Sequence, residues 1–159
     1  MRKVIIITAF AGFGMLAACS GNANEGEIKK LNERITALEN ELEELKETAG
    51  PGLAELMNQN YGHLQKLETA IAEGNWEYAE FCMHEMEETF EKIEYIHNNH
   101  DELVQPASEQ FKAFIYPVFE SLEAAVEAHD EPKAADLFIN LKTNCGKCHT
   151  ANNHGFIAL

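Results

Sequence analysis

The stretch LFINLKTNCGKCH, residues 137–149, decides the fold prediction because its apolar side chains follow a helical spacing. Phe138, Leu141, Cys145 and Cys148 are separated by three, four and three residues. Side chains at these separations lie on one face of an α-helix. We therefore expect a final helix whose apolar face points into a core made by other helices.

Three more amphipathic helices are expected upstream, each bounded by residues that interrupt helices. Their apolar positions recur every three or four residues over 53–73, 76–97 and 111–126. Gly74 ends the first of them and Asn75 can cap the second. Pro117 lies inside the third and should kink it, because proline cannot donate a backbone hydrogen bond to Ala113. Asp130 and the residues after it begin the final helix.

Four helices with short connections must run antiparallel to their neighbours. No stretch of the chain shows the alternating pattern of a β-strand. The sequence therefore predicts an all-α fold, with an antiparallel four-helix bundle over residues 52–159.

The segment CGKCH, residues 145–149, has the C-x-x-C-H spacing of a c-type haem attachment sequence. On a helix, Cys145, Cys148 and His149 project from one face. The two thiols can then bond to the vinyl groups of the haem while the imidazole reaches the iron. We expect one covalent haem c, held by thioethers from Cys145 and Cys148, with His149 as the proximal axial ligand.

Other uses of these cysteines fit less well. A thioredoxin-type dithiol needs a βαβ unit, and the sequence predicts none. A zinc site needs further ligands, of which His154 supplies one, and the adjacent Cys148 and His149 would bind one ion awkwardly. A disulfide between Cys145 and Cys148 would be strained.

Residues 52–159 resemble the class II c-type cytochromes, which are cytochrome c′-like four-helix bundles. The resemblance rests on the helix count, the short connections and the C-terminal C-x-x-C-H motif. It implies that a sixth iron ligand, where there is one, is a methionine of the first bundle helix, and Met57 matches that position. The chain departs from the pattern in its N-terminal segment and in a tail of only ten residues after His149.

The expected order of the helices limits which residues can lie near the haem. In the expected bundle, the end of the last helix lies beside Met57, Tyr61, His97, Phe111 and Phe114. Met57 is the candidate sixth ligand, with ordinary core filling as its alternative role. His97 is the rival ligand, or a hydrogen-bonded core residue. Tyr61, Phe111 and Phe114 are candidates for packing against the haem.

The other histidines and the remaining thiol are not assigned to the site. We expect Cys82 to be a buried, inert thiol. The histidines expected at the surface or behind the ligands are His63, His84, His100, His129 and His154.

A helical stalk is expected over residues 27–49. Its large apolar side chains form a heptad seam at Ile28, Leu31, Ile35, Leu38, Leu42 and Leu45. In a parallel homodimer through residues 28–45, Arg34 would face Glu39 of the partner and Glu41 would face Lys46. The alternative is a helix that folds its seam against the rest of its own chain.

Residues 1–18 read as an export signal. Basic residues precede an uncharged apolar stretch that is shorter than the roughly 20 residues of a membrane-spanning helix. The stretch ends in LAAC, which resembles the lipobox of bacterial lipoproteins and implies cleavage before Cys19 and lipidation of that residue. Residues 19–26 would be a flexible tether. We expect an exported protein on the periplasmic or outer face of a bacterial membrane, anchored through its lipid.

The net charge of the 159-residue chain limits the kinds of partner that it can have. The chain has 27 acidic and 12 basic side chains and a net charge of −15, which argues against nucleic acid as a partner. The same charge favours a basic redox partner. The leading function is single-electron transfer by a carrier rather than an enzyme. The alternatives are nitric oxide or carbon monoxide binding at a five-coordinate haem, and a coiled-coil interaction lipoprotein with a structural haem.

Overall fold

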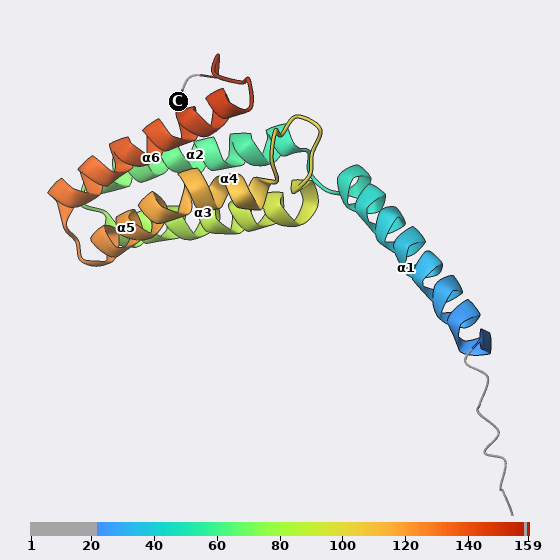
Figure 1. Cartoon of the computed structure of the whole chain (residues 1–159). Coiled ribbons are helices and arrows are strands. Elements are labelled where there is room, and N and C mark those ends of the chain that lie inside the picture. The colour runs from blue at the N-terminus through green and yellow to red at the C-terminus, as the bar shows by residue number, and fades with distance from the viewer. Residues whose placement is uncertain (1–21, 158) are drawn as a thin grey trace, which may run out of the picture. The chain divides into compact units, whose positions relative to one another are not determined.

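The computed structural model describes residues 22–157 and 159, and Figure 1 shows that this part of the chain is built from helices. No strand occurs among these residues. The prediction of an all-α fold is therefore confirmed for them. The helices are α1 (Asn22–Ala49), α2 (Leu53–Ala72), α3 (Trp76–His97), α4 (Ala107–Phe114), α5 (Tyr116–Glu127) and α6 (Glu131–Ala151).

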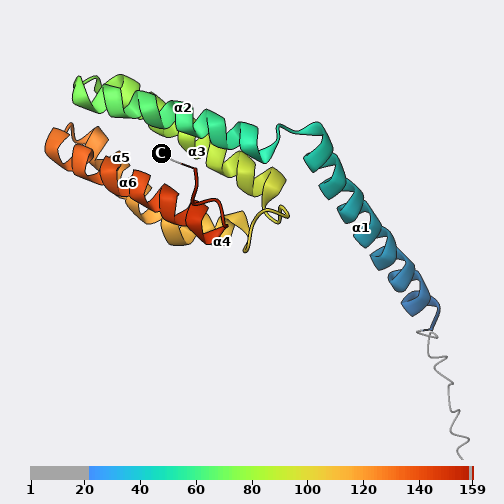
Figure 2. The ribbon, with the colours of Figure 1, turned by 90° about the horizontal axis from the view of Figure 1, so that it is seen from above.

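The described residues from 41 onward form one compact unit and those before residue 41 belong to another, so the boundary between the units falls within α1. In the larger unit, α2 packs along α3 and α5 packs along α6 (Figure 2). Contacts of α2 with α6, and of α3 with α5, join the two pairs around one apolar core. The short α4 contacts α3, α5 and α6. The largest fully buried side chains are Leu56, Leu67, Met83, Met86, Ile93, Ile115, Leu122, Leu141, Val126 and Cys82.

Capping side chains fix the starts of two helices where the sequence predicts them. Asn75 Oδ1 accepts a hydrogen bond from the backbone N–H of Tyr78 at 3.4 Å. Asp130 Oδ1 accepts one from the N–H of Lys133 at 3.3 Å. These contacts satisfy N–H groups that have no partner within the helix.

The predicted kink at Pro117 takes the form of a break between α4 and α5. Ile115, with φ −105° and ψ −62°, separates the two helices. Backbone hydrogen bonds still run through it, from Ile115 N–H to Phe111 O and from Phe119 N–H to Ile115 O. Because Pro117 has no N–H, the interruption falls directly before the first turn of α5.

Helix α1 begins at Asn22, within the stretch predicted to be a flexible tether. The six side chains of its heptad seam are 48% to 60% exposed. Lys46 Nζ lies 3.4 Å from Glu43 Oε2 and 4.1 Å from the centre of the Tyr95 ring. Lys46 is therefore engaged within its own chain, which weakens its expected pairing with Glu41 of a partner. Among the described residues, no helix is both long and apolar enough to cross a membrane.

Candidate functional site

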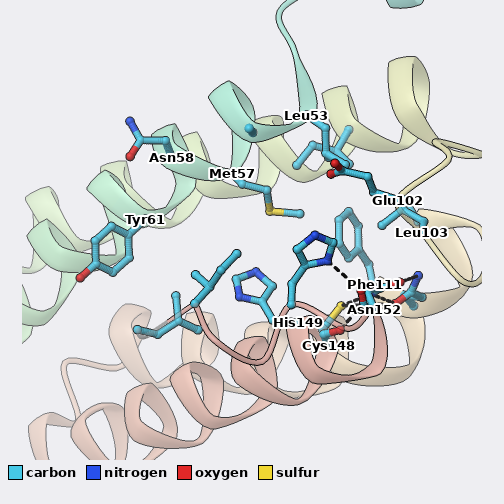
Figure 3. Close-up of a pocket in the computed structure, with 17 residues that line it drawn as sticks. Leu53, Met57, Asn58, Tyr61, Glu102, Leu103, Phe111, Cys148, His149 and Asn152 are labelled. Carbon is cyan, nitrogen blue, oxygen red and sulfur yellow. Dashed lines mark hydrogen bonds between the residues drawn. The ribbon is translucent and has the colours of Figure 1, made fainter.

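A cavity of about 420 Å³ lies between α2 and the C-terminal end of α6. Its volume falls within the range of small-molecule and cofactor sites, roughly 300–1,000 Å³. Most of its wall is apolar, and the loop after α3, helix α4 and the C-terminal tail complete it (Figure 3). The side chains discussed below that line it are Met57, Tyr61, Glu102, Gln110, Phe111, Cys148, His149, Asn152 and His154.

Helix α6 places two of the three C-x-x-C-H residues in the cavity wall. Cys148 is buried at 7% exposure and lines the cavity, as does His149. Cys145 is partly buried and packs against the core, and it is not among the residues that line the cavity. Burial raises the pKa of Cys145 to about 12, and it also raises the pKa of Cys148. Both thiols are free.

Met57 and His149 face the same cavity from opposite helices. Figure 3 shows the Met57 thioether pointing inward from α2 and the His149 imidazole pointing inward from α6. Met57 is only half-buried, because it lies beside the fully packed stripe of α2 and borders the cavity. Burial lowers the pKa of His149, and the nearby His154 lowers it further. His149 Nδ1 is buried and has no hydrogen-bond partner.

Two of the three aromatic residues that are expected to pack against the haem line the cavity. Tyr61 and Phe111 line the cavity. Phe114 does not, because it lies about one helical turn further along α4, and it packs against the core instead. Packing of these rings against a haem stays a prediction, and only Tyr61 and Phe111 border the cavity.

The rival ligand His97 lies outside the cavity lining. It is 2% exposed, and its Nε2–H donates a hydrogen bond to the carbonyl of Pro51 at 2.8 Å. This contact holds the segment between α1 and α2 against the end of α3. The structure thus gives His97 the hydrogen-bonded core role that the sequence left open.

A buried pair of amides behind Cys148 was not predicted. Gln110 Nε2 donates to Asn152 Oδ1 at 3.0 Å, and Asn152 Nδ2 donates to Gln110 Oε1 at 2.5 Å. Asn152 Nδ2 also donates to the carbonyl of Cys148 at 2.8 Å, and the Cys148 thiol donates to Gln110 Oε1 at 3.5 Å. The pair joins α4 to the end of α6. Its partners are 42 residues apart, so no local pattern indicates them.

His154 is a further residue that the sequence did not assign to the site. The chain reverses after α6, and His154 lines the cavity together with His149. Glu102, from the loop after α3, lines the same cavity and is exposed. Among the described residues, no group of three or more His, Cys, Asp and Glu side chains is arranged to hold a metal ion alone.

Comparisons with protein-family models, curated proteins and solved structures found no match to this chain. The functional argument therefore depends on the cavity and its residues.

Proposed function

We propose that the cavity between α2 and α6 binds one haem c and that the protein carries single electrons. The proposal depends chiefly on one observation: the C-x-x-C-H residues Cys148 and His149 share an apolar cavity with Met57. Cys145 and Cys148 would hold the haem as thioethers, with His149 as one axial ligand and Met57 as the other. Haem c would supply the redox-active iron.

The residues present suit such a group. Two free thiols and an imidazole lie within five residues of one helix end, which is the donor set that c-type attachment needs. The cavity is largely apolar, so its wall gives a low-dielectric setting that influences a reduction potential. Phe111 and Tyr61 offer ring surfaces to a flat ligand.

We also propose a specific arrangement for the helices around the cavity. If α4 and α5 count as one bent helix, then α2, α3, α4–α5 and α6 form an antiparallel four-helix bundle like that of the class II c-type cytochromes. The contacts of α2 with α3 and α6, and of α3 with α5, support this assignment.

The test is the visible spectrum of the ferrous holoprotein with and without carbon monoxide. If Met57 fills the sixth position, the wild-type spectrum is six-coordinate and changes little with carbon monoxide. A Met57→Leu variant, which keeps the side-chain volume but removes the sulfur, should bind the gas readily.

Met86→Leu is the matched control, because Met86 is 1% exposed and lies away from the cavity lining. It should behave as wild type. Ready carbon monoxide binding by the wild type, unchanged in Met57→Leu, would contradict ligation by Met57 and would favour the gas-binding alternative.

The membrane anchor and the redox partner remain part of the proposal. Cys19 and the export signal lie outside the described residues, so lipidation is inferred from the LAAC sequence alone. The net charge of −15 and the acidic Glu102 at the cavity favour a basic partner that docks near it.

We also propose that α1 pairs in parallel with α1 of a second copy. The exposed seam gives the apolar contact, and in the parallel form opposite charges on its flanks meet. In a parallel pair, Arg34 of one chain faces Glu39 of the other. In a fully overlapped antiparallel pair, residue 28 lies opposite residue 45, and Arg34 would be nearest Glu41 while Glu39 would be nearest Asn32. Contact between positions 34 and 39 is therefore specific to the parallel form, and exchanging these two charges tests it.

A further inference from the structure

The end of α6 turns back through a Schellman motif that brings two histidines to the cavity. The N–H of His154 donates to the carbonyl of His149 at 2.8 Å, and the N–H of Asn153 donates to the carbonyl of Thr150 at 3.1 Å. Asn153 has φ +62°, in the left-handed region that this motif requires. The motif usually joins two apolar side chains at the positions that His149 and His154 occupy. Here both side chains are imidazoles, and both line the cavity.

A hydrogen bond fixes which nitrogen of His154 carries the proton. His154 Nδ1 lies 2.7 Å from the backbone carbonyl of Asn152. A carbonyl oxygen only accepts, so Nδ1–H is the donor, and in the neutral ring Nε2 keeps its lone pair. His154 thus offers an acceptor nitrogen at the cavity.

His149 has the complementary group. Its Nδ1 is buried and has no partner, although a buried polar nitrogen is costly to leave unpaired. When the other ring nitrogen, Nε2, binds a metal, Nδ1 carries the proton and becomes a donor. Histidines that bind metals almost always donate this second N–H to a nearby acceptor.

We propose that His154 is a positioning residue for the axial ligand, and that its Nε2 accepts a hydrogen bond from Nδ1–H of His149 in the haem-loaded protein. The inference rests on the proposed function. The contact fixes the orientation of the His149 ring and makes it a stronger electron donor. An electron-rich axial ligand stabilises the oxidised iron, so His154 lowers the reduction potential.

The test compares His154→Phe with His154→Gln in holoprotein. Phenylalanine keeps an aromatic ring but removes the acceptor, whereas the Oε1 of glutamine can take the place of Nε2. Potentiometric titration should show a higher reduction potential for His154→Phe and a potential near wild type for His154→Gln. In ¹⁵N-labelled ferrous protein, the Nδ1–H of His149 should exchange slowly in wild type and lose this protection in His154→Phe.

Asn153→Gly is the matched control, because glycine keeps the positive φ and leaves both imidazoles in place. It should retain the wild-type potential. Equal potentials in wild type and His154→Phe would overturn the inference while leaving the haem assignment intact. A high potential in His154→Gln as well as His154→Phe would also overturn it, since the acceptor would not be what matters. Failure of the wild type to carry covalent haem would instead contradict the proposed function.

Discussion

At the residue scale, some polar side chains beside the cavity form hydrogen bonds with residues that are distant in the sequence, as Gln110 does with Asn152. Sequence spacing predicts Cys148, His149 and Met57 at one place, because helix periodicity and the expected antiparallel topology together indicate which turns lie side by side. It does not predict the Gln110–Asn152 amide pair, because a single polar residue at a helix end is normally a cap or a surface residue.

Removing one amide of this pair should lower the stability of the fold. Gln110→Leu leaves the buried Asn152 side chain without two of its hydrogen bonds. We expect a loss of about 1–3 kcal/mol in the free energy of unfolding, measured by urea denaturation of the holoprotein. Gln59→Leu is the control, since Gln59 is exposed on α2 and should change stability little. Equal stabilities for Gln110→Leu and wild type would show that the pair contributes nothing.

At the scale of elements, helix boundaries are well predicted where a side chain caps the backbone. Asn75 and Asp130 cap the N-termini of α3 and α6 as the sequence indicates. The end of α6 is harder to predict because Asn153, rather than glycine, adopts the positive φ that turns the chain back. The sequence therefore leaves open whether His154 lies at the surface or behind the ligands. The sequence predicts a kink near Pro117 but not the break at Ile115. The missing N–H of proline shows that one helical hydrogen bond is lost, but it does not show where the helix is interrupted.

The orientation of the α1 stalk can be tested by exchanging charges. In soluble haem-loaded protein that begins at Ser20, Arg34→Glu should weaken the parallel dimer, because the new carboxylate would face Glu39 of the partner. Each exposed pair is worth less than about 1 kcal/mol, so two altered pairs should raise the dimer Kd on the order of tenfold. Adding Glu39→Arg should restore it, as sedimentation equilibrium can measure.

Restoration is specific to the parallel pairing, because in an antiparallel pair the carboxylate introduced by Arg34→Glu would lie nearest Glu41, and a change at position 39, which lies nearest Asn32, would not relieve that repulsion. A wild-type protein that stays monomeric at all concentrations, or a double variant that is not restored, would contradict the parallel stalk.

At the scale of the whole molecule, the helical unit from residue 41 onward contains a cavity lined by Met57 of α2 and by Cys148 and His149 of α6. The all-α class was predictable from apolar periodicity alone. The cavity itself was not, because it arises where Met57, Phe111 and the C-terminal tail leave space between packed helices.

The most direct test of the central claim is the mass of the denatured protein after expression with haem-maturation machinery. We predict a gain equal to one haem that survives denaturation and is lost in the Cys145→Ser/Cys148→Ser double variant. A chain whose mass shows two unmodified thiols, or a haem that leaves on denaturation, would contradict covalent attachment at this site.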